Sequence, residues 1–141
     1  MTASVEPDDP MLWLLRERSK DTVKLTRWML RVIDLPAAVA ARGYPAGVSA
    51  DTLVEVADPQ RPANSGAWRL TIASGRGQAV RATASEGGDV PRLTIGGFSA
   101  LFAGVQAGSV RRAGLLSGGT AGSDDLLGAA FVAKPYMIDY F

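Results

Sequence analysis

Hydrophobic and polar positions alternate along the middle of the chain, and this two-residue period is typical of half-buried strands. In residues 67–73 the large apolar positions are Trp68, Leu70 and Ile72. Beyond a glycine-containing turn at 74–77, the apolar positions are Val80, Ala82 and Ala84. Together the two runs predict a β-hairpin. The same pattern predicts further strands at 24–33, 52–57 and 91–95.

The N-terminal third contains two predicted helices. A short helix is expected within residues 11–21, where the apolar cluster MLWLL precedes a charged stretch. A second helix is expected over Pro36–Arg42, with Asp34 as its N-cap and Gly43 just after its end. The proline suits the first turn because its missing N–H would have no partner there.

Beyond residue 96 the apolar positions recur with the period of a helix. One stripe consists of Phe98, Leu101, Phe102 and Val105. Residues 109–116 predict another short helix. We expect a last helix capped by Ser123, with Asp124 and Asp125 near the positive end of its dipole, and ended by Pro135. Its inward positions are predicted to be Leu126, Leu127, Ala130 and Phe131.

The succession of helix, strand, helix, several strands and then helices predicts the fold class. It favours an α+β fold, an antiparallel or mixed sheet of about five strands with helices packed on one face. The 141 residues suffice for one domain with a sizeable core. We expect residues 1–10 to be a linker or leader and residues 11–141 to form that domain.

The amino-acid composition excludes several classes of function. Fifteen Lys and Arg nearly balance fourteen Asp and Glu, so no field for nucleic acid or an anionic membrane is expected. The chain has no Cys and no His, which excludes thiolate metal sites and Ser-His-Asp or Cys-His catalysis within it. It shows no membrane span and no signal peptide, and we expect a cytoplasmic location.

Three short motifs suggest chemistry but have simpler interpretations. Gly75-Arg76-Gly77 resembles part of a phosphate-binding loop, but predicted strands flank it, which favours a hairpin turn. Ser99 has no His to activate it and is expected at a helix entry. Asp124-Asp125 lacks a third ligand nearby, so helix capping is favoured over metal binding. No cofactor or metal site is predicted within the chain.

The last five residues, Met137–Phe141, are mostly apolar and end on a large aromatic side chain. Such a segment gains free energy by docking against the fold, and docking would hold the α-carboxylate of Phe141 in place. This group is ionised at neutral pH, because a free α-carboxyl has a pKa of about 3.3–3.7. Two interpretations stay open: the carboxylate is solvated or salt-bridged, or it accepts a proton in a site as a base.

Several segments together resemble the C-terminal domain of the Eis-type (enhanced intracellular survival) N-acetyltransferases. The resemblance runs from residue 8 to residue 141, and the strand-to-helix segment around Asp34-Leu35-Pro36-Ala37-Ala38 is its most specific part. The similar segments are Asp8–Leu15 (DDPMLWLL), Trp28–Ala38 continuing to Ala41-Arg42-Gly43-Tyr44, Gly66-x-Trp68-x-Leu70, Leu101–Gly104, Arg112–Leu116 and the final Phe.

This resemblance implies a fold similar to sterol carrier protein, placed after GNAT regions that bind acetyl-CoA. In that family the domain helps to wall the acceptor-amine site and inserts the terminal carboxylate there. Phe141 would then be the catalytic base through its α-carboxylate, and Tyr140 and Asp139 would lie near the acceptor pocket.

The implied partners are the GNAT domains of a parent chain and a small-molecule or peptide amine, in a homo-oligomer. The GNAT signature needs Arg or Gln where this chain has Ile72, so acetyl-CoA is expected to be a cosubstrate of the parent chain's GNAT portion. We therefore expect the isolated domain to be inactive.

Two other functions stay open. A stand-alone carrier of a lipid or other apolar ligand would need a tunnel bordered by Phe98, Phe102 and Phe131. A structural or oligomerisation module would need no chemistry at all.

Overall fold

The structure is a computed structural model that describes residues 10, 14, 29–83 and 89–135. The chain divides into two compact units, and every helix and strand with bounds given below lies in the unit Leu30–Ala133. The predicted leader and the predicted helix near the N-terminus fall almost wholly outside the described residues.

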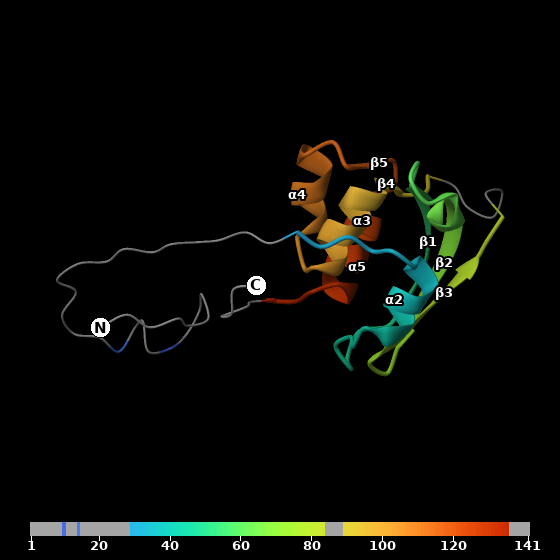
Figure 1. The fold of residues 1–141 in the computed structure, drawn as a ribbon. Coiled ribbons are helices and arrows are strands. Elements are labelled where there is room, and N and C mark those ends of the chain that lie inside the picture. The colour runs from blue at the N-terminus through green and yellow to red at the C-terminus, as the bar shows by residue number, and fades with distance from the viewer. Residues whose placement is uncertain (1–9, 11–13, 15–28, 84–88, 136–141) are drawn as a thin grey trace. The chain divides into compact units, whose positions relative to one another are not determined.

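A five-stranded mixed sheet forms one layer of this unit (Figure 1). Its strands are β1 (Ala50–Ala57), β2 (Gly66–Ala73), β3 (Arg76–Arg81), β4 (Arg92–Thr94) and β5 (Leu116–Ser117). The order across the sheet is β3-β2-β1-β4-β5, and the β1–β4 pair is parallel while the other pairs are antiparallel. The predicted hairpin is therefore confirmed as β2–β3.

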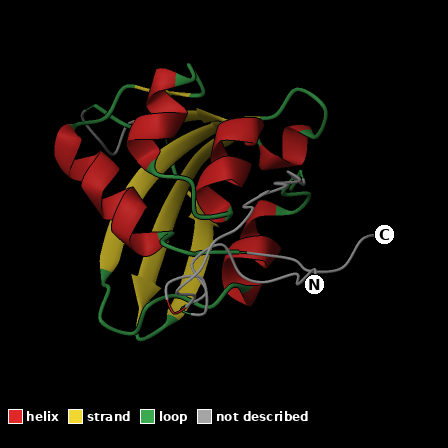
Figure 2. Ribbon diagram, turned by 90° about the vertical axis from the view of Figure 1, so that its left-hand side faces the viewer, coloured by secondary structure: helices red, strands yellow, loops and turns green. Residues whose placement is uncertain are grey.

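Helices cover one face of the sheet, in front of it in Figure 2, as predicted for this α+β fold. They are α2 (Leu35–Ala41), α3 (Ile95–Phe102), α4 (Ala107–Arg112) and α5 (Ala121–Ala130), with a short 3-10 turn at Pro62–Asn64. The Asp34 side chain accepts a hydrogen bond from the Ala37 N–H, which confirms Asp34 as the N-cap of α2.

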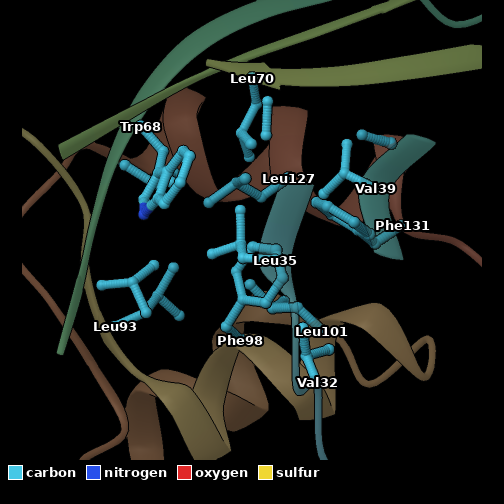
Figure 3. Close-up of a cluster of buried hydrophobic side chains, with 14 of the residues drawn as sticks. Val32, Leu35, Val39, Trp68, Leu70, Leu93, Phe98, Leu101, Leu127 and Phe131 are labelled. Carbon is cyan, nitrogen blue, oxygen red and sulfur yellow. The ribbon is translucent and has the colours of Figure 1, made fainter. Parts of the chain in front are cut away.

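The core lies between the sheet and the helices (Figure 3). Trp68, Leu70 and Ile72 are buried, so the alternation in β2 predicted its inward face correctly. In β3 the prediction was wrong, because Ala79 is buried whereas Val80 is exposed. The inward positions of β3 are small because the Tyr44 ring lies where a side chain at Gly77 would be.

Residues 29–33 are extended but do not belong to the sheet, so the predicted strand at 24–33 is wrong over its described part. Val32 is buried and Met29 is exposed, as strand-like alternation would require. The backbone of this segment forms hydrogen bonds with side chains instead of with a neighbouring strand. The Val32 N–H donates to Ser99 Oγ, and the Ile33 carbonyl accepts from Asn64 Nδ2. Side chains thus take the place of a neighbouring strand.

Four helix ends differ from the predicted ones. α3 ends at Phe102, so Val105 is exposed and does not continue the apolar stripe. The break follows from Gly104, whose φ of 90° is outside the helical region. α5 is capped by Thr120, and Ser123 completes the capping box as its third residue.

α2 ends in an extended residue, Arg42, and Gly43 does not adopt a left-handed conformation. Of the predicted helix 109–116, only the first part is helical, because Leu116 belongs to β5. Phe131, Ala130 and Leu127 are buried as expected, and Leu126 is partly buried.

Candidate functional site

The predicted site residues Asp139, Tyr140 and Phe141 lie outside the described residues, as do Trp13 and Trp28. The nearest described chain before them is the end of α5 and the residues that follow it. The contacts that fix this end are therefore the structural features closest in sequence to the predicted base.

Arg42 joins three helix ends. It is the C-cap of α2, and its guanidinium donates from Nε to the Phe102 carbonyl at 3.1 Å and from Nη2 to the Phe131 carbonyl at 3.0 Å. Phe102 is the last residue of α3, and Phe131 is the C-cap of α5. Carbonyls at helix ends have no partner within the helix and carry partial negative charge, so they suit a cation.

Aromatic rings surround the same guanidinium. Its central carbon lies 5.1 Å from the Tyr44 ring centre, 5.4 Å from that of Phe102 and 5.3 Å from that of Phe131, distances at which cation–π attraction operates. No carboxylate within the described residues forms an ion pair with Arg42. We call Arg42, Tyr44, Phe102 and Phe131 the Arg42 cluster.

Burial lowers the pKa of Arg42 from its usual value, and Coulombic interaction with Tyr44 opposes this shift. Burial also raises the pKa of Tyr44, with Arg42 acting in the opposite direction. The Tyr44 hydroxyl donates to the Val39 carbonyl at 3.1 Å, so it is engaged within the fold. At neutral pH the cluster therefore presents a charged guanidinium and a neutral phenol.

The chain that leaves α5 has a second close contact. A Cβ atom placed on Gly104 would lie 2.5 Å from the Ala133 carbonyl oxygen, so only glycine allows this approach. The positive φ of Gly104 favours glycine independently. Residues Phe131 to Ala133 are thus held by Arg42 on one side and by the α3–α4 turn on the other.

The rings in this region pack against one another. Phe98 and Phe131 are fully buried and meet edge to face with ring centres 5.8 Å apart, and Phe102 lies 6.4 Å from Phe131. These are the side chains expected to border a ligand tunnel in the carrier hypothesis. Their mutual contacts do not favour that hypothesis.

A second polar cluster lies at the other end of α2. Asp58 is 1% exposed, and its carboxylate accepts from Arg31 at 2.7 Å and from Asn64 Nδ2 at 2.9 Å. Asn64 also accepts from the Leu35 N–H, and its carbonyl binds the Trp68 indole N–H at 2.8 Å. We call Arg31, Asp58, Asn64 and Trp68 the Asp58 cluster, which ties the segment before α2 to the loop between β1 and β2.

Burial alone would raise the pKa of Asp58, but other effects outweigh it and lower the pKa below its ordinary value. They are the hydrogen bonds from Asn64 and from the backbone of Arg61 and Gln60, and the charge of Arg31. No buried side-chain polar atom among the described residues lacks a partner. The Asp58 cluster is therefore complete without a ligand.

The motifs that suggested chemistry have structural roles. Gly75 forms the β2–β3 turn with a φ of 78°, as the hairpin interpretation predicted. Ser99 is buried in α3 and donates to the Ile95 carbonyl. Asp124 binds Arg111 through two hydrogen bonds of 2.7 Å, and no metal-binding group of three acidic or His side chains occurs among the described residues.

A shallow pocket of about 230 Å³ lies where β1, β4 and β5 meet. Its two charged side chains, Glu55 and Arg92, form an ion pair with each other at 3.2 Å, and both are about half exposed. None of the described helices is long and apolar enough to cross a membrane.

We compared the chain with models of known protein families. The model of the sterol carrier protein domain family matches residues 35–138. This match covers most of the chain, including α2, the whole sheet and the Arg42 cluster. The chain therefore belongs to the sterol carrier protein domain family. The comparison with curated proteins gave no match.

Similar solved structures come from acetyltransferases. A GCN5-related N-acetyltransferase of Kribbella flavida is 42% identical over 97% of this chain, with a TM-score of 0.89. One of Anabaena variabilis is 30% identical over 96%, with a TM-score of 0.84. Eis1 of Mycobacterium abscessus is 25% identical over 79%, with a TM-score of 0.61. This chain spans 35%, 34% and 27% of those three chains respectively.

Proposed function

We propose that this chain is the accessory C-terminal domain of an Eis-like, acetyl-CoA-dependent amine N-acetyltransferase. The observation that carries the proposal is the 42% identity over 97% of the chain to a GCN5-related N-acetyltransferase of which it spans 35%. The acetyl-CoA site then belongs to the remaining part of the parent chain. The domain's own contribution is a wall of the acceptor-amine site.

The proposal includes the chemistry of the C-terminal residue. The α-carboxylate of Phe141 accepts the proton that the acceptor amine loses as its nitrogen attacks the acetyl carbonyl. The carbon–sulfur bond then breaks, and coenzyme A leaves as a thiolate that becomes the thiol by taking up that same proton, which returns the carboxylate to its ionised form. A carboxylate is ready for this role at neutral pH, and apolar surroundings would raise its pKa and make it a better base. Tyr140 and Asp139 border the acceptor amine in this proposal.

The test moves the carboxylate without removing it. In the full-length enzyme, one glycine appended after Phe141 displaces the carboxylate by up to about 3.6 Å. We expect kcat to fall by roughly 10²- to 10⁴-fold, the usual range for losing a general base. The matched control is Phe141→Leu, which keeps the carboxylate in place and should retain most of the rate.

Full turnover by the variant with the added glycine would overturn the role of Phe141. A parent reading frame without a GNAT region upstream of residue 8 would overturn the broader assignment. Size-exclusion chromatography of both variants separates lost chemistry from lost assembly, the outcome that a purely structural module would give.

A further inference from the structure

The compact unit Leu30–Ala133 contains no lysine. The lysines of the chain, Lys20, Lys24 and Lys134, all lie outside it. No side chain of the unit therefore carries a primary amine, although Lys is among the commonest residues of soluble proteins. Every cationic side chain within the unit is an arginine.

These arginines supply the positive charges that hold the fold. Arg42 donates to three carbonyls, those of Gly43, Phe102 and Phe131. Arginine is also the cation of each ion pair described within the unit: Arg31 with Asp58, Arg69 with Asp51, Arg92 with Glu55 and Arg111 with Asp124. The stability of the unit thus depends on guanidinium groups and on no ammonium group of its own.

The geometry requires a guanidinium at only some of these positions. Arg111 needs its planar fork, because it donates two bonds of 2.7 Å to Asp124 and one of 2.7 Å to the Gly118 carbonyl. Arg92, in contrast, donates a single bond of 3.2 Å to Glu55, and its side chain is about half exposed. A lysine ammonium could form one such bond equally well. The choice of arginine there has another reason than geometry.

An acetyl donor can neutralise a lysine but not an arginine. The deprotonated lysine amine attacks the acetyl carbon of a thioester, a carbon–nitrogen bond forms, the carbon–sulfur bond breaks, and the thiol leaves with a proton from the amine. The product is an amide without the positive charge. A guanidinium stays protonated at neutral pH and does not make this attack.

We propose that the absence of amines makes the unit Leu30–Ala133 inert toward acetylation, so that the charges that hold its fold persist beside an acetyl-transfer site. The inference rests on the proposed function for the source of the acetyl groups. Its chemical content is independent of that function: acetylation of every amine in the chain leaves the fold intact, because each ion pair described in the unit has a cation that cannot be acetylated.

The test is chemical acetylation of the full chain with N-hydroxysuccinimidyl acetate. The amines form amides and release N-hydroxysuccinimide, hydroxylamine then removes acetyl groups from hydroxyls, and mass spectrometry locates those that remain. We expect the urea midpoint of unfolding to be the same before and after acetylation of the natural sequence.

Two variants introduce an amine into the unit. Arg111→Lys brings one to Asp124, whose side chain is 16% exposed, and acetylation should raise the unfolding equilibrium constant of this variant at least several-fold. Arg92→Lys is the matched control. It brings an amine to the half-exposed Glu55, where loss of the charge should change the constant much less.

A fall in the midpoint of the acetylated natural sequence would overturn the proposal, because lysines outside the unit would then support the fold. It would also be overturned if the amine introduced by Arg111→Lys escaped acetylation, or if its acetylation left the midpoint unchanged, since a lysine would then serve as safely as an arginine. The reagent replaces acetyl-CoA, so this result does not depend on the proposed function, whose failure would show separately in the variant with the added glycine.

Discussion

The two ends of α2 are held by arginines that use different partners. Before the helix, Arg31 binds a fully buried carboxylate, Asp58, within a network of hydrogen bonds. After the helix, Arg42 binds backbone carbonyls and aromatic rings, and no carboxylate of the described residues pairs with it.

The Asp58 cluster ties the segment before α2 to the loop between β1 and β2, whereas the Arg42 cluster joins the ends of three helices. The Asp58 cluster depends on an ionised acid and on several partners whose loss leaves buried groups unsatisfied. The Arg42 cluster depends on partial charges at helix ends, which do not titrate. The first should therefore respond to pH and dominate stability, whereas the second should do neither.

The largest effect should come from Asn64→Leu. This substitution removes the partner of Asp58 Oδ2, of the Leu35 N–H and of the Ile33 carbonyl, while Asp58 stays buried. We expect the free energy of unfolding to fall by about 3 kcal/mol or more, because unsatisfied buried groups cost about 1–3 kcal/mol each. Urea unfolding measures it. The control is Gln60→Ala, which keeps the backbone bond to Asp58 and should change little.

A smaller effect is expected from Arg42→Met, which keeps an apolar stem but removes the charge and the three hydrogen bonds. We expect a loss of about 1–2 kcal/mol, because the site is only partly buried and water can replace part of these bonds. The same urea titration applies, with the exposed Arg112→Met as control. A loss that exceeds that of Asn64→Leu would reverse the comparison between the two clusters.

The pH dependence should separate the clusters further. The pKa of Asp58 is lower in the folded state, so its contribution to stability is complete above the unfolded value of about 3.9 and is lost as pH falls through the folded pKa. Unfolding measured between pH 6 and pH 2.5 should therefore show an acid-induced loss that shrinks in Asp58→Asn. The Arg42→Met variant should keep the full acid dependence.

The smallest effect is expected from Glu55→Gln, which breaks an ion pair with Arg92 between two half-exposed side chains. Such pairs contribute little, and we expect a change below about 0.5 kcal/mol that disappears in 1 M salt. A change as large as that of Arg42→Met would show that charge on the outer sheet face matters more than the contacts at the helix ends.

The sequence predicted the parts of the fold in which local pattern and burial agree. β2 has a strict alternation and was placed correctly, and Asp34 is the N-cap that its position before Pro36 indicated. The segment 29–33 alternates in the same way but pairs with side chains, which no local pattern can reveal. The parallel pairing of β4 with β1 was equally hidden, because it joins three residues to a strand far away in the sequence.

Sequence reasoning missed the Arg42 cluster, although its signal was present. A basic residue at the end of a helix is a recognised partner for the last carbonyls, but the carbonyls that Arg42 binds belong to α3 and α5. Only the tertiary fold brings these three ends together. Asp139, Tyr140 and Phe141 stay predictions, since they lie outside the described residues.

The order of the strands determines which of them could pair with a strand from another chain. Among the described residues, β3 and β5 form the sheet's edges. β5 has only two residues, and β3 begins and ends with arginines, Arg76 and Arg81, so neither edge is a good template for a strand from a neighbour. In the part of the chain that the structure describes, both edges of the sheet are therefore poor sites for edge-to-edge aggregation.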